Sequence, residues 1–153
     1  MMNTIRWLGG VAGLVWLTGG SAWACPDFSG DYLRTMENSH EQLHIEQIAC
    51  ETMNVRSIVT FDDGEEPHTI DDVWLLDGMP QTSPQYPAAM RITRQLEEDT
   101  LVTEGKMISE NRFLHFISRS RLNAEGNISN TIAYYGPFGG VQRTETEVFV
   151  RRR

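Results

Sequence analysis

Apolar and polar residues alternate along most of the chain after Gly30, in short runs separated by turn residues. This period-2 alternation is typical of β-strands with one buried face. In the stretch 53–62, for example, Val55, Val59 and Phe61 fall on the same face. No long helical stripe interrupts the pattern. It predicts nine strands, near residues 30–37, 41–50, 53–62, 67–77, 88–97, 100–110, 112–123, 126–136 and 140–151.

The connections between these predicted strands are short, and several carry an Asp-Gly or Glu-Gly pair suited to tight hairpins. The exception is Gly78–Pro87, whose three prolines prevent ladder pairing. Short connections make sequential strands pair as neighbours, and closing such a meander removes its exposed edges. We therefore expect an all-β fold: an antiparallel up-and-down meander closed into a small barrel of about 8–10 strands. A two-sheet β-sandwich is the alternative.

The first 24 residues are typical of an export signal. Arg6 supplies the positive charge, residues 7–18 form an apolar stretch too short to span a bilayer, and Ala22 and Ala24 occupy the small-residue positions before a cleavage site. The expected organisation is a signal peptide over residues 1–24 and a single barrel domain over residues 25–153. The predicted location is the periplasm or the exterior of the cell.

The sequence has two cysteines, Cys25 and Cys50. An exported protein with an even cysteine count usually pairs them, so we predict a Cys25–Cys50 disulfide. The alternative is a lipid on Cys25, which would leave Cys50 as a free thiol. A lipoprotein signal favours an aliphatic residue three places before the cysteine, where this chain has Ala22 followed by the bulky Trp23.

The charge balance narrows the choice of partners. The formal net charge is −8, and it becomes −9 if Arg6 leaves with the signal peptide. An acidic surface argues against nucleic acid as a partner, because phosphate binding needs clustered cations. The basic cluster Arg151–Arg153 at the C-terminus is interpreted as a solvated end. No apolar run long enough to span a membrane follows the signal.

Both ends of the predicted domain resemble those of lipocalin-like barrels, the calycin group. Gly30-Asp31-Tyr32 is similar to the G-x-W element that opens their first strand, with Tyr32 in the place of tryptophan, and 148–151 is similar to their closing strand. The resemblance implies that Arg151 contacts Tyr32 through a cation–π interaction and closes the barrel. It also implies a fold that often holds one small apolar molecule. The chain leaves no room for the helices that these families add to the barrel.

Four large residues are candidates for lining such an interior: Trp74, Met90, Phe116 and Tyr134. The alternative is that they fill a solid core, since side chains can occupy the interior of a small barrel completely. Four polar residues lie on strand faces that point either inward or to solvent, namely Asp72, Arg94, Arg119 and Asn130.

No catalytic motif emerges. A disulfide removes both thiols as nucleophiles. His40 and His44 alternate with Glu46 on one strand face, but no further ligand lies at a spacing typical of a metal site. We therefore expect no metal, no cofactor and no enzyme activity. The leading hypothesis is an exported protein that binds a small apolar or amphipathic ligand. The alternative is a protein-interaction module of the cell envelope, an assembly factor or inhibitor with a solid core, acting through the Gly78–Pro87 loop and an exposed Tyr86.

Overall fold

The computed structural model describes residues 24–109 and 112–153, so the predicted signal peptide lies outside the described residues except for Ala24. The described residues form nine strands and no helix. No helix that could cross a membrane occurs in this part of the chain. The strands are β1 (Gly30–Met36), β2 (Ser39–Ile48), β3 (Thr52–Phe61), β4 (His68–Leu75), β5 (Arg91–Glu97), β6 (Thr100–Ser109), β7 (Arg112–Leu122), β8 (Ile128–Tyr135) and β9 (Val141–Arg151).

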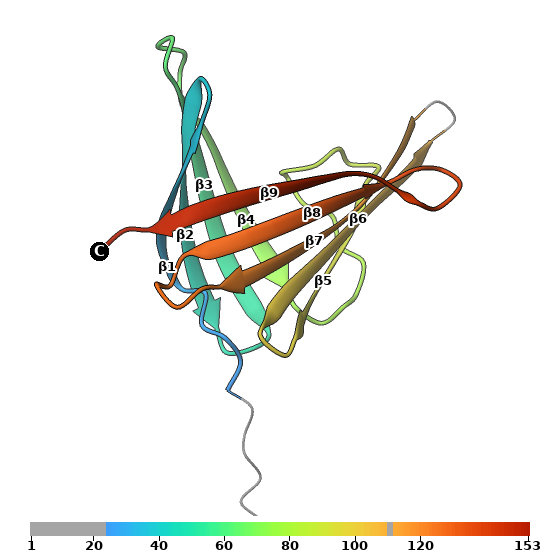
Figure 1. Ribbon diagram of the computed structural model, residues 1–153, viewed down its shortest axis with the longest axis horizontal. Coiled ribbons are helices and arrows are strands. Elements are labelled where there is room, and N and C mark those ends of the chain that lie inside the picture. Colours follow the sequence, from blue (N-terminus) through green and yellow to red (C-terminus); the bar gives the residue numbers. More distant parts are fainter. Residues whose placement is uncertain (1–23, 110–111) are drawn as a thin grey trace, which may run out of the picture.

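All nine strands belong to one antiparallel sheet in the order β4-β3-β2-β1-β9-β8-β7-β6-β5. The first strand pairs with both its sequence neighbour β2 and the last strand β9, so the meander curls into a nearly closed barrel (Figure 1). The predicted all-β barrel is confirmed, and a sandwich of two separate sheets is excluded by the β1–β9 pairing. Each of the nine observed strands overlaps its predicted counterpart, with bounds that differ by up to three residues.

The barrel has a seam between β4 and β5, which are the two ends of the sheet order. Residues 76–90 run along this seam (Figure 1). The loop pairs with β5 through backbone bonds, in which Gln81 and Ile92 exchange N–H and C=O groups at 2.8 and 2.9 Å. On the other side, the Gln81 side chain donates to the Leu75 carbonyl at 2.8 Å. A proline-rich segment therefore completes the wall that strand pairing leaves open.

Two apolar clusters fill opposite parts of the interior. The larger contains Phe28, Tyr32, Leu43, Ile45, Met53, Val55, Leu76, Leu101, Ile128 and Phe149. The smaller contains Met90, Ile92, Met107 and Phe116, with Tyr86, Leu114, Ile132 and Tyr134 packed against it. Their members come from alternating strand positions, as the sequence pattern predicts.

The predicted disulfide is present between Cys25 and Cys50, with the two Cα atoms 5.8 Å apart. Extending the β1–β2 register Gly30↔Ile45 by five residues in each direction places these cysteines opposite each other. The Gln47 side chain fixes the segment before β1 beside β2. Its Oε1 accepts from Phe28 N–H and its Nε2 donates to the Pro26 carbonyl, both at 2.9 Å. The bridge therefore continues the first hairpin beyond its last ladder pair.

The first and last strands meet near residue 151. Tyr32 pairs with Arg151 in the β1–β9 register, and the Arg151 guanidinium lies 5.9 Å from the centre of the buried Tyr32 ring. The same guanidinium donates to the Ser29 carbonyl at 2.6 Å. Gly30 has a φ of 151°, and a Cβ there would lie 3.1 Å from Arg151 Nε. The glycine therefore leaves the space in which the arginine packs against Tyr32.

Candidate functional site

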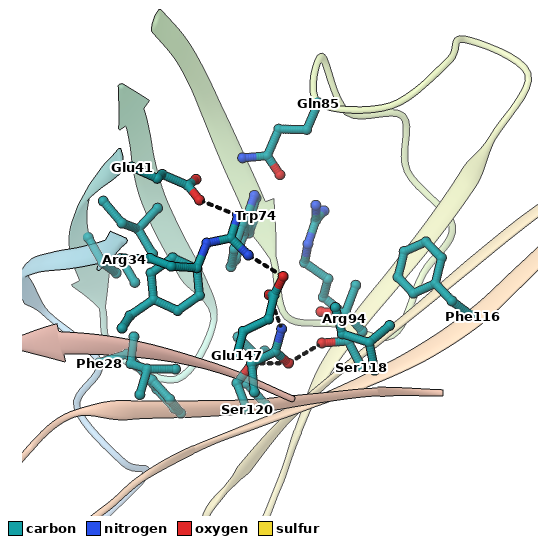
Figure 2. A pocket seen from close by; sticks show the side chains of 18 of the residues that line it. Phe28, Arg34, Glu41, Trp74, Gln85, Arg94, Phe116, Ser118, Ser120 and Glu147 are labelled. Atoms are coloured by element: carbon teal, nitrogen blue, oxygen red, sulfur yellow. Dashed lines mark hydrogen bonds and ion pairs between the residues drawn. The ribbon is translucent and has the colours of Figure 1, made fainter. Parts of the chain in front are cut away.

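A cavity of about 270 Å³ lies inside the barrel, between the two apolar clusters (Figure 2). This volume lies just below the range of roughly 300–1,000 Å³ that is usual for small-molecule sites. Strands on both sides of the β1–β9 junction and the seam loop all contribute to its wall. The lining residues are Phe28, Arg34, Glu41, Leu43, Ile45, Trp74, Gln85, Tyr86, Arg94, Leu101, Thr103, Phe116, Ser118, Ser120, Ile128, Asn130, Ile132, Glu147 and Phe149.

A polar layer crosses this cavity, and its first part is centred on Arg34. The Arg34 guanidinium forms ion pairs with Glu41, at 2.7 Å, and with Glu147. It also lies 4.9 Å from the centre of the Phe149 ring. Ser57 Oγ donates to the second Glu41 oxygen at 2.6 Å. These contacts tie β1, β2, β3 and β9 together from the inside.

Asn130 extends the layer to β7 and β8. Its Nδ2 donates to Glu147 Oε2 at 3.2 Å, and its Oδ1 accepts from Ser118 Oγ at 2.5 Å and from Ser120 Oγ at 3.1 Å. Figure 2 shows these bonds running in a chain from the arginine to the two serines. The Glu147 carboxylate is therefore bonded through both of its oxygens.

The second part of the layer is centred on Arg94, whose side chain is 1% exposed. Its Nη2 lies 3.6 Å from Asp72 Oδ2, and its guanidinium lies 4.5 Å from the centre of the Trp74 ring. Asp72 Oδ2 also accepts from Trp74 Nε1 at 2.9 Å and from Ser83 Oγ at 2.5 Å. Burial lowers the pKa of Arg94, while the Asp72 charge opposes that shift. This cluster joins β4, β5 and the seam loop.

The seam loop places Tyr86 inside the barrel. Its ring centre lies 5.6 Å from that of Phe116, which packs closely on β6 because residue 105 is glycine: a Cβ there would lie 2.2 Å from the Phe116 ring. Gln85 reaches the cavity from the same loop (Figure 2). The loop thus contributes side chains to the site as well as covering the seam.

The structure brings only some of the residues proposed from sequence into the cavity wall. Trp74 and Phe116 line it, whereas Met90 and Tyr134 are outside the lining and belong to the smaller apolar cluster. Tyr134 donates to Glu145 at 3.2 Å and lies 4.3 Å beneath the Arg143 guanidinium. Of the four polar candidates, Arg94 and Asn130 line the cavity, Asp72 is buried beside Arg94, and Arg119 is exposed.

One expectation about the seam loop is wrong. Tyr86 is not exposed but half-buried against Phe116, so its ring is not an outward-facing contact for another protein. His44 lies on the outside of the barrel with its Nδ1 2.7 Å from Asp31 Oδ1. No group of three His, Cys, Asp or Glu side chains within the described residues is arranged to hold a metal ion.

Sequence reasoning missed three charged residues of the cavity wall, Arg34, Glu41 and Glu147. Each lies two positions from a buried apolar residue of the same strand, respectively Tyr32, Leu43 and Phe149. Because alternate residues of a strand share a face, this spacing was a signal that the charges point inward.

The fold and the cavity together define the class as a nearly closed antiparallel β-barrel with an interior site. Among solved structures, the barrel is similar to a mutant of the fluorescent protein UnaG, with a TM-score of 0.58 over 82% of this chain and 96% of that one. The two sequences are 9% identical over this match, so the similarity concerns the fold. No family model and no curated protein matches the sequence.

Alkaline pH provides a test of the placement of Tyr86. Burial raises the pKa of the Tyr86 phenol above its ordinary value of about 10. The folded state favours the neutral phenol. The resulting contribution of Tyr86 to stability is complete below the ordinary pKa and is lost as the pH rises through the higher folded-state pKa. We expect Tyr86→Phe to move the alkaline unfolding midpoint upward, as followed by circular dichroism across a pH titration. An unchanged midpoint would contradict the burial.

Proposed function

We propose that the protein is an exported carrier that holds one small apolar or amphipathic molecule inside the barrel. The observation that carries this proposal is the interior cavity of about 270 Å³, whose wall combines ten apolar or aromatic side chains with nine polar or charged ones. In small-molecule pockets, apolar and aromatic side chains contact the body of the ligand and polar groups fix its orientation.

The parts of the cavity have different roles in this proposal. The rings of Trp74, Tyr86 and Phe116 supply apolar contact area for the body of the ligand. Arg94 supplies hydrogen-bond donors for its polar end. Residues 1–24 are the export signal, and the Cys25–Cys50 disulfide is compatible with an oxidising destination in the periplasm or outside the cell. Lipocalin-like ligand binding is the form of activity that the two chain ends suggest.

Native mass spectrometry of protein purified without detergent tests this function directly. We expect a discrete added mass that is released on denaturation and recovered in a solvent extract. Protein that carries no added mass, and that binds nothing from an extract of its own host cells, would contradict the proposal.

A substitution that fills the cavity tests whether the ligand lies inside the barrel. Ile132 lines the cavity from β8 and is half-buried, so Ile132→Trp places a larger side chain in the site. We expect this variant to melt cooperatively and to lose the added mass. For comparison, the variant Thr131→Trp, changed on the exposed face of the same strand, should retain the added mass. Equal retention of the ligand by both variants would place the ligand outside the barrel.

A further inference from the structure

The polar layer has a surplus of hydrogen-bond donors. Within the described residues, the buried side-chain nitrogens that lack a partner are Arg34 Nε, Arg94 Nε and Arg94 Nη1. Two of the three therefore belong to Arg94, whose side chain is 1% exposed and lines the cavity (Figure 2). A buried donor without a partner is costly, so this side chain favours a ligand that supplies acceptor oxygens.

The acceptors of the layer, in contrast, are already engaged. Each oxygen of Glu41 and of Glu147 has a partner: Ser57 and Arg34 for the former, Arg34 and Asn130 for the latter. The two Asp72 oxygens accept from the Val73 backbone, Trp74 and Ser83. The layer therefore offers a ligand donors rather than acceptors.

The charges of the layer decide which acceptors suit it. Its two arginines face three carboxylates, so its formal charge is −1 before anything binds. Arg94 also has its own counter-ion, since Asp72 lies 3.6 Å away. An added carboxylate would share Arg94 with Asp72 and meet its repulsion where water screens poorly, while an uncharged carbonyl oxygen would accept from Arg94 without that repulsion.

We infer that the cavity selects an uncharged aromatic molecule with a carbonyl-type acceptor, and that it discriminates against the corresponding acid. This inference rests on the proposed carrier function and specifies the chemical class of its ligand. Arg94 donates to the carbonyl oxygen, and the rings of Trp74, Tyr86 and Phe116 contact the aromatic body. Asp72 provides the discrimination, because it holds the counter-ion position that an acid would otherwise take.

The test uses two probes with the same ring system, 2-naphthamide and 2-naphthoate, at neutral pH, where the naphthoate is ionised. Isothermal titration calorimetry on the ligand-free protein measures both affinities. We expect the amide to bind about tenfold more tightly or better. Asp72→Asn should remove this preference by strengthening naphthoate binding, because it removes the charge and keeps an acceptor for Trp74 and Ser83.

The neighbouring residue provides the matched control. Asp71 pairs with Arg56 on the outside of the barrel, so Asp71→Asn changes the total charge equally and should leave the preference intact. If Asp72→Asn does not fold, Glu147→Gln provides the second variant, since it also removes one carboxylate charge of the layer and should strengthen naphthoate binding.

Two results would overturn the inference. Naphthoate binding that equals or exceeds amide binding in the unaltered protein would refute the selection while leaving the carrier function in place, because the cavity would still be occupied. An equal effect of Asp71→Asn and Asp72→Asn would assign the preference to the overall charge of the molecule. The carrier function itself fails only if the protein carries no added mass and binds nothing from the cell extract.

Discussion

Replacing Asp72 with leucine should destabilise the protein by about 3–5 kcal/mol, because it leaves Arg94 buried without its counter-ion. The Arg94 side chain is 1% exposed, and Asp72 is the acidic residue paired with it in the part of the chain that the structure describes. The substitution also removes the acceptor for Trp74 Nε1 and Ser83 Oγ. Urea unfolding followed by circular dichroism would measure the loss.

The adjacent position again provides the comparison. Asp71 forms its ion pair with Arg56 on the surface, where both side chains are more than half exposed. Exposed pairs contribute little, so Asp71→Leu should leave the urea midpoint nearly unchanged. Adding Arg94→Met to Asp72→Leu should restore part of the lost stability by removing the unpaired charge. If the two single substitutions had similar effects, the buried pair would not stabilise the seam.

Removing the disulfide should produce the second large effect. Cys25 and Cys50 close a loop with a sequence separation of 25 residues, for which the chain-entropy model gives about 3–4 kcal/mol of stabilisation. For a domain of this size, we expect Cys25→Ala/Cys50→Ala to melt roughly 10 °C lower. Differential scanning calorimetry would measure the shift.

Reduction provides an independent route to the same state. A reducing agent should lower the melting temperature of the unaltered protein by a similar amount and should not affect the double variant. If neither the reducing agent nor the double substitution changed the melting temperature, the Gln47 hydrogen bonds would be sufficient to hold the residues before β1 without the disulfide.

The strands could be predicted from sequence because each contributes its own local signal. Alternation marks which residues share a face, and glycine-containing turns separate the runs. The β1–β2 register was not predictable in the same way, because the two turn residues between Met36 and Ser39 are Glu37 and Asn38 and include no glycine to mark the turn. Barrel closure likewise has no local signal. It was predicted because the two edge strands of a long open meander would otherwise be free to pair with another chain.

The site was predictable only in part. Trp74 and Arg94 alternate with exposed residues along their strands, so the sequence pattern indicates which face of each strand points inward. Arg34 and Glu147 could have been found in the same way, but their pairing joins residues more than a hundred positions apart and depends on barrel closure. The seam loop has no periodicity that predicts the inward position of Tyr86. That position results from tertiary packing on Phe116.

The pairing of β1 with β9 has a consequence for the order in which the chain folds. Each of the other strand pairs joins sequence neighbours, so hairpins can form locally as the chain is made. The first strand, in contrast, keeps one edge open until the last strand has been synthesised, and the Arg34–Glu147 ion pair waits for the same event. Throughout that interval, the edge of β1 is available to another chain. Delaying the folding of the early hairpins until synthesis is complete would shorten this exposure of the β1 edge.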